Sequence, residues 1–110
     1  MSAFGPEKAY DFANFDLIDV SGNLEIVVLN SEEYSVKFAG NESDLEKLDI
    51  TQDGSGLKIN WGGEPKIKGV ITLPLLDEIH LANKVNCQLS GFENNNFSLH
   101  ASTGSTCEAN

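Results

Sequence analysis

Two ten-residue stretches near the end of the chain match one another at an interval of twenty residues. "IHLANKVNCQ" occupies positions 79–88 and "LHASTGSTCE" occupies positions 99–108, so that His80 corresponds to His100 and Cys87 to Cys107. A self-similar period of about twenty residues is the length of one coil in a solenoid of stacked β-strands. The repeat therefore predicts that these two stretches stack as successive coils.

The alternation of residue types within the repeat predicts which side chains face inward. Successive side chains of a strand point to opposite faces. In both stretches one parity is apolar or small and includes the cysteines, whereas the other parity is polar and includes the histidines. We expect the cysteines inside and the polar parity outside, at Glu78, His80, Asn86, Gln88, Ser98, His100, Thr106 and Glu108.

Two histidines and two cysteines at a matched interval raise the question of a metal site. Zinc in a structural site needs four ligands that converge at about 2.0–2.3 Å on one point. Here the histidines form an outer ladder and the cysteines an inner one, with the wall of the coil between them. We therefore predict no metal site from these four residues, and no Cys–His nucleophile pair for the same reason.

The matched cysteines also raise the question of a disulfide. Stacked strands lie about 4.8 Å apart, which is inside the Cα–Cα window of about 4.4–6.8 Å that a disulfide needs. Side chains in a ladder point parallel to one another, however, and this direction suits the bond poorly. We favour free thiols at Cys87 and Cys107, with the disulfide as the alternative.

The rest of the chain also has the pattern of a β-rich protein. Short segments with period-two alternation lie at residues 34–38, 57–61 and 67–73, between turns rich in Gly, Asn and Ser. One short helix is expected at residues 43–48, and Trp61 shares the inward parity of Leu57 and Ile59. "LEIVVL", at residues 24–29, is apolar on both faces, so we expect the chain itself to cover both.

The composition and net charge of the chain limit the classes of partner that it can bind. The chain has 110 residues, which suits one small domain. It carries 17 acidic residues against 7 basic ones, all of them Lys, for a net charge of −10. This charge repels nucleic acid and anionic lipid, so neither is expected as a partner. The sequence contains no run of eighteen apolar residues, so no membrane insertion is expected. The first residues lack the pattern of a signal peptide.

No arrangement of residues points to catalysis or to a cofactor. Asp77 and Glu78 are adjacent, so their carboxylates point to opposite faces of a strand, whereas a glycosidase pair must face one cleft. The acidic residues between Glu42 and Asp53 miss the spacing of a calcium loop. We expect no catalytic residues, no cofactor and no metal.

Several motifs in order resemble one bacterial family. They are "F-x-x-I-x-V-S-G" at residues 15–22, "DGSGLKI" at 53–59 and "LP-x-L-x-x-I" at 73–79. With the repeat that follows, they resemble the putative auto-transporter adhesin, head GIN domain family. The resemblance spans residues 12–110, so we expect a tail at 1–11 and a single domain at 12–110, with coils clearest at 76–110.

The resemblance implies an all-β fold, a short right-handed single-stranded β-helix (β-solenoid) with an N-terminal β-rich layer. It also implies an extracytoplasmic setting, either periplasmic or at the cell surface, and it carries over no catalytic residues. Two departures stand out. The coils stop after the second, as in a chain truncated at its C-terminus, and the first corner has Asn83 and Lys84 where Gly104 serves the next corner. Asn tolerates the left-handed backbone that such a corner needs.

Together these observations predict a non-enzymatic binding or adhesion module that recognises a glycan or a surface protein. The expected ligand-facing surface is His80, Asn86, Gln88, His100, Thr106 and Glu108. One alternative is a structural module that assembles into homo-oligomers through the open edge of its C-terminal coil. A second alternative, by analogy of fold alone, is an enzyme that acts on polysaccharides.

Overall fold

The computed structural model describes residues 7–63, 66–92, 97–102 and 104–109. Within them lie eleven strands and one short helix. The elements are β1 (Glu7–Tyr10), β2 (Leu17–Gly22), β3 (Leu24–Asn30), β4 (Ser35–Ala39), α1 (Glu42–Lys47), β5 (Asp49–Asp53), β6 (Gly56–Trp61), β7 (Ile67–Leu73), β8 (Glu78–Ala82), β9 (Asn86–Ser90), β10 (Ser98–Ala101) and β11 (Thr106–Ala109).

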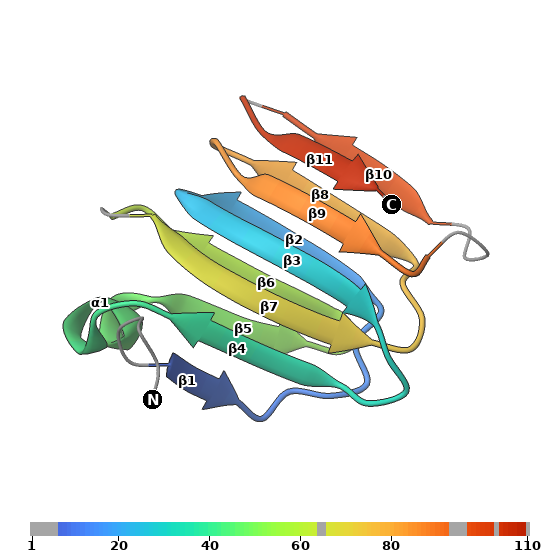
Figure 1. Ribbon diagram of the computed structural model, residues 1–110, viewed down its shortest axis with the longest axis horizontal. Coiled ribbons are helices and arrows are strands. Elements are labelled where there is room, and N and C mark those ends of the chain that lie inside the picture. The colour runs from blue at the N-terminus through green and yellow to red at the C-terminus, as the bar shows by residue number, and fades with distance from the viewer. Residues whose placement is uncertain (1–6, 64–65, 93–96, 103, 110) are drawn as a thin grey trace.

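The strands form two sheets that lie face to face (Figure 1). The six-stranded sheet has the order β1-β4-β7-β3-β9-β11, and the five-stranded sheet has the order β10-β8-β2-β6-β5. Both sheets are mixed, because β1, β4 and β5 pair antiparallel and the remaining pairs are parallel. No helix of the described residues is long and apolar enough to cross a membrane.

Four strand pairs, β2–β3, β6–β7, β8–β9 and β10–β11, each begin in the five-stranded sheet and end in the six-stranded one. The predicted stacking of the twenty-residue repeat is confirmed. Leu99 lies opposite Ile79 in the parallel β8–β10 ladder, and Cys107 lies opposite Cys87 in the parallel β9–β11 ladder. The corner also forms as expected, since Asn83 has a φ of 63° and Gly104 a φ of 80°.

The prediction of a right-handed β-helix with a separate N-terminal layer is wrong; the fold is an all-β sandwich of two mixed sheets. In a solenoid each coil lies beside the next one in the sequence. Here β2 and β3 instead lie in the middle of their sheets, between β6–β7 on one side and β8–β9 on the other. Antiparallel β4 and β5 then extend the same sheets. The local repeat at residues 79–108 is therefore a property of the last two layers and not of the whole chain.

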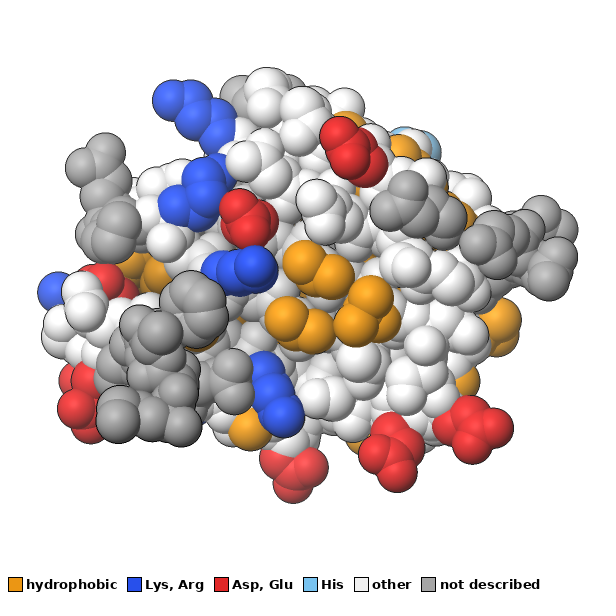
Figure 2. Space-filling model, viewed as in Figure 1, with side chains coloured by type: hydrophobic (Ala, Val, Ile, Leu, Met, Phe, Trp, Pro, Cys, Tyr) orange, Lys and Arg blue, Asp and Glu red, His pale blue; other side chains and the backbone are white. Residues whose placement is uncertain are grey.

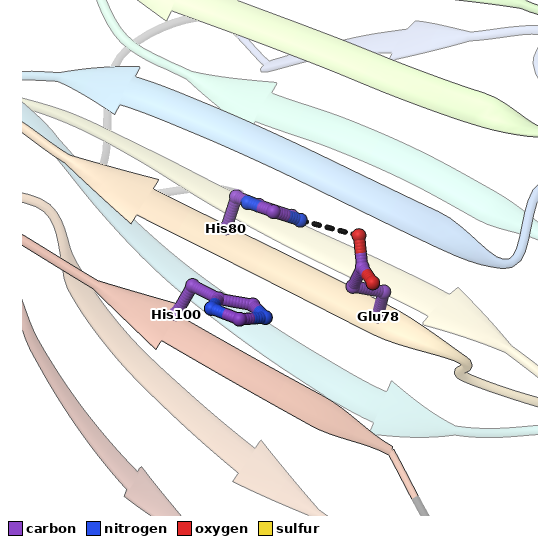
Figure 3. A group of neighbouring side chains, drawn as sticks. All are labelled: Glu78, His80 and His100. Atoms are coloured by element: carbon purple, nitrogen blue, oxygen red, sulfur yellow. Dashed lines mark hydrogen bonds and ion pairs between the residues drawn. The ribbon is translucent and has the colours of Figure 1, made fainter.

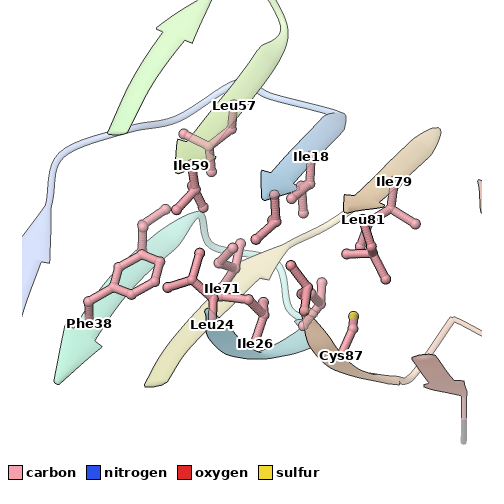
Figure 4. Packing of buried hydrophobic residues seen from close by; sticks show 14 of the residues in the cluster. Ile18, Leu24, Ile26, Phe38, Leu57, Ile59, Ile71, Ile79, Leu81 and Cys87 are labelled. Carbon is pink, nitrogen blue, oxygen red and sulfur yellow. The ribbon is translucent and has the colours of Figure 1, made fainter. Parts of the chain in front are cut away.

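The core lies between the two sheets and takes alternate residues from both (Figure 4). In β6, β7 and β8 the buried residues recur at every second position, which confirms the predicted parity. Trp61 is 5% exposed, as its alternation with Leu57 and Ile59 predicts. The described residues bury no polar or charged side chain, so burial of apolar surface is the main source of stability.

Two segments are less covered than their sequences predict. In β3 one face is fully buried, but Val27 and Leu29 on the other face are only half-buried and no further layer of the described chain covers them. The prediction that the chain covers both faces is wrong. In β10 all four residues are exposed, including Leu99 at 44%, because β10 is an edge strand.

The start of the described chain forms an edge of the six-stranded sheet, and the helix packs against the core. Residues 7–10, within the expected tail, form β1 and pair with β4. The helix begins at Glu42, one residue before the expected start, and buries Leu45 against the core. The boundary of the domain at residue 12 stays a prediction.

Gly69 has no side chain, and the buried ring of Phe38 occupies the space where its Cβ would lie. It lies opposite Phe38 in the antiparallel β4–β7 pair, and Phe38 is fully buried. A Cβ atom on residue 69 would lie 2.3 Å from Cε2 of that ring. Because Phe38 is fully buried in a close-packed interior, a side chain at residue 69 would force this ring to move.

We expect Gly69→Ala to lower the free energy of unfolding by about 1–3 kcal/mol, because the new methyl group overpacks the core against Phe38. Urea denaturation measures this change. Gly62→Ala is the matched control, since a Cβ atom there meets nothing within 4 Å, and it should stay within about 0.5 kcal/mol. An equal loss in both variants would contradict the contact, as would an undiminished loss in a Phe38→Leu background.

The two cysteines are both free thiols, and Cys87 is buried while Cys107 is half-buried. The hydrogen bond with Cys107, followed by burial, raises the pKa of the Cys87 thiol far above its ordinary value. The same hydrogen bond lowers the pKa of Cys107. The thiolate is the reactive form of cysteine, so Cys107 is the more reactive thiol of the pair.

We expect iodoacetamide to alkylate Cys107 in the folded protein well before Cys87. The buried thiol has both less access and less thiolate at neutral pH. Mass spectrometry of peptides from Glu-C digestion at successive times measures the two rates, because cleavage after Glu93 puts Cys87 and Cys107 on separate peptides. Cys107→Ser should leave the folded protein nearly unlabelled, whereas urea should allow both cysteines of the unmodified chain to react. Equal rates in the folded chain would contradict the arrangement.

Candidate functional site

The outer face of the five-stranded sheet carries a row of polar side chains that crosses every strand. Backbone register places Thr51 opposite Lys58, Lys58 opposite Asp19, Asp19 opposite His80 and His80 opposite His100. We call these five residues, one from each of β5, β6, β2, β8 and β10, the polar row. It combines a cation, a carboxylate, a hydroxyl group and two imidazoles on one open surface.

Two shallow hollows lie along this row and share Asp19. The first has a volume of about 220 Å³ and is lined by Asp19, Ser21, Asp49, Thr51, Lys58, Ile59 and Asn60. The second has a volume of about 580 Å³ and is lined by Asp19, His80, Leu81, Ala82, Leu99, His100, Ala101 and Ser102. Ser21 donates a hydrogen bond of 3.2 Å to the Asn60 side-chain oxygen in the first hollow. The face therefore offers donors and acceptors along its whole width.

The histidine end of the row contains a compact cluster (Figure 3). The His80 and His100 rings stack with centroids 4.7 Å apart and planes 17° apart, as in-register neighbours on parallel strands do. Glu78 lies two residues before His80 on β8, so alternation returns its side chain to the same face. Its Oε2 lies 2.5 Å from His80 Nε2.

The carboxylate of this cluster is tuned by its neighbours. The hydrogen bond from His80 lowers the pKa of Glu78, slight desolvation opposes that change, and the charges of His80 and His100 support it. Glu78 is therefore a carboxylate at neutral pH.

The six residues predicted to face a ligand lie on two opposite surfaces. His80 and His100 belong to the polar row, on the outer face of the five-stranded sheet. The other four project from β9 and β11, on the outer face of the six-stranded sheet. They are Asn86, Gln88, Thr106 and Glu108, which with Glu25 line a hollow of about 250 Å³. No single ligand-facing wall unites all six.

The face with the second group also has an apolar centre. Half-buried Val27 and Leu29 of β3 lie there beside half-buried Val70 of β7, which is opposite Val27. Figure 2 shows apolar side chains gathered near the middle of this face. Next to them Lys68 and Glu25 form an ion pair of 3.6 Å. The two outer faces of the sandwich thus differ in chemistry.

Sequence reasoning missed Asp19, Lys58 and Thr51, and it did not connect Glu78 with the histidines. Alternation within residues 17–22 and 56–61 does place Asp19 and Lys58 outward. What the sequence does not reveal is that β2 lies between β6 and β8. That neighbourhood joins residues about forty to sixty positions apart, with no repeat to mark it.

Solved structures of proteins from Bacteroides and Parabacteroides have the same fold. A putative adhesin from Bacteroides fragilis matches with a TM-score of 0.81 at 13% identity, over 98% of this chain and 54% of that one. A putative adhesin from Parabacteroides distasonis matches with a TM-score of 0.71 at 13% identity, over 94% of this chain and 56% of that one. A putative lipid binding protein from Parabacteroides distasonis matches with a TM-score of 0.70 at 14% identity, over 80% of this chain and 42% of that one.

The chain spans about half the length of these solved relatives. No curated protein matches it in a sequence comparison. The family model described as putative auto-transporter adhesin, head GIN domain, matches residues 14–110. This match covers nearly the whole chain and agrees with the resemblance carried by its motifs, so the chain belongs to the head GIN domain family of putative auto-transporter adhesins.

Proposed function

We propose that the chain is a non-enzymatic binding module of an extracytoplasmic bacterial protein, and that it binds a glycan or a surface protein. The observation that carries this proposal is the polar row across the five-stranded sheet. Membership of the adhesin family supports the extracytoplasmic setting, periplasmic or at the cell surface, in this proposal.

The chemistry of the polar row suits a ligand rich in hydroxyl groups. Asp19 accepts hydrogen bonds, Lys58 donates them, and Thr51 can do both. Each is held by a strand rather than by a loop, so the spacing of the row is fixed by the backbone ladder. An extended polymer that crosses the strands would meet one polar side chain at every step of about 4.8 Å.

The shape of the surface favours binding over catalysis. The two hollows are shallow and remain open to solvent. Catalytic pockets and small-molecule sites are usually concave and exclude water from the reacting atoms. A flat polar face offers contacts along a length and gives little enclosure at any one point, which suits recognition of a large ligand.

We expect the purified chain to be retained by one member of a panel of polysaccharides and matrix proteins, without formation of cleavage products. Pull-down measures retention, and chromatography of the supernatant measures products. Asp19→Ala and Lys58→Ala should each lower retention by about tenfold, as the loss of a charged hydrogen bond does. Neutral and anionic lipid vesicles are tested beside the panel, because one solved relative bears the name of a putative lipid binding protein. Retention by vesicles alone would contradict a glycan or protein ligand.

Gln88→Ala is the matched control, because Gln88 is an exposed polar residue on the opposite face. It should leave retention unchanged. Retention lost only in Gln88→Ala would move the binding surface to the six-stranded sheet and overturn the choice of face. Cleavage products would replace the binding module with an enzyme that acts on polysaccharides. No retention by any member would contradict the proposal.

A second candidate function is assembly through the edge strand β10, and the exposure of Leu99 is the observation that favours it. An edge strand presents unpaired backbone groups to a further strand. In this function the chain would associate with copies of itself at increasing concentration.

We expect Leu99→Lys to weaken such self-association by about tenfold or more, because charge on an edge strand opposes pairing. Sedimentation velocity over a range of concentrations measures it. Leu75→Lys is the matched control, because this substitution adds the same charge at a residue that is 59% exposed and lies outside any strand. A monomer at all concentrations, or an equal effect of both variants, would contradict assembly through β10.

A further inference from the structure

Three potential metal ligands converge on the outer face of the five-stranded sheet. They are Glu78, His80 and His100, and their donor atoms all lie within 4.8 Å of one another. In Figure 3 both imidazoles direct a nitrogen-bearing edge toward the Glu78 carboxylate. We propose that these three side chains bind one divalent transition-metal ion of the Zn²⁺ type.

The distances suit one ion after small movements of side chains. Tetrahedral zinc with nitrogen and oxygen ligands places neighbouring donor atoms about 3.3 Å apart. His80 Nε2 and Glu78 Oε2, now 2.5 Å apart, would open by about 0.8 Å as the ion takes the place of the shared proton. The third donor comes from an edge strand whose four residues are all exposed, so His100 has room to turn toward the other two.

The kinds of donor select the kind of ion. Imidazole nitrogen binds zinc, copper, nickel and iron, whereas calcium and magnesium take oxygen ligands. Two imidazoles and one carboxylate are three of the four ligands that zinc uses. Three protein ligands leave a position for water or for a group of another molecule.

The backbone and the neighbouring strand prepare the site. In-register pairing of β8 with β10 fixes the two imidazoles side by side. Asp19 lies beside His80 in the adjacent strand and lines the same hollow as both histidines. A carboxylate in that place can accept a hydrogen bond from the imidazole nitrogen that does not face the metal, which orients a ligand and strengthens it.

The sequence predicted no zinc site from a four-ligand set of two histidines and two cysteines. That set is separated by the sheet, since Cys87 is buried and the histidines lie outside. Glu78 joins the two histidines as a third ligand, and the cysteines are not needed. The metal site shares His80 and His100 with the polar row, but its test needs no glycan or protein ligand.

Zinc titration of the purified chain without a histidine tag tests the site, with two readouts. Isothermal calorimetry should give one site per chain. NMR spectra of the imidazole nitrogens should show both histidines changing together, and the chain has only two histidines to assign. His80→Gln, His100→Gln and Glu78→Gln should each weaken zinc binding by about tenfold or more, because each removes one ligand.

Asp77→Asn is the matched control for Glu78→Gln. It removes the same charge from the adjacent exposed residue, which precedes β8 and does not belong to the cluster, and it should leave the affinity unchanged. Calcium or magnesium in excess should not compete. Unchanged imidazole signals at millimolar zinc would overturn the site, as would equal affinities in all variants. Binding that disappears on blocking Cys107 with iodoacetamide would assign the zinc to the thiols and would also overturn it.

Discussion

The parallel, in-register pairing of the strands is the constraint on which the rest of this structure depends. It places Ile18 of β2 between Leu57 of β6 and Ile79 of β8, so that each buried row of one sheet is continuous across strands far apart in the sequence. A slip of one residue would exchange the inward and outward sets in a whole strand. The core between the sheets and the polar row on the outside are therefore fixed by the same backbone ladders.

Local patterns predicted the parts of the fold that depend on neighbours within a strand or within one repeat. Alternation identified the inward positions of β6, β7 and β8, and the match between residues 79–88 and 99–108 identified two parallel ladders. The same reasoning extended the repeat to the whole chain and arrived at a β-helix. That step failed because β2–β3 pairs with β6–β7 and β8–β9 on its two sides, an arrangement with no periodic mark in the sequence.

The candidate site also combines residues that the repeat could predict as neighbours with residues whose neighbourhood depends on pairing of distant strands. His80 and His100 could be placed together because they occupy equivalent positions of the repeat. Asp19 and Lys58 could be placed outward but not beside them, because their neighbourhood comes from pairing of strands distant in the chain. The residues Asn86 and Glu108 share the parity of the histidines within the coil, yet the chain crosses to the other sheet before it reaches them.

The core of this protein makes its stability depend on temperature in a particular way. Every buried side chain of the described residues is apolar, and burial of such groups is driven by entropy near room temperature and weakens on cooling. Unfolding such a core raises the heat capacity, by about 12–15 cal/mol/K for each residue, so the stability curve is a dome with its maximum at about 10–20 °C. Cooling as well as heating away from this maximum therefore lowers the free energy of unfolding of the sandwich.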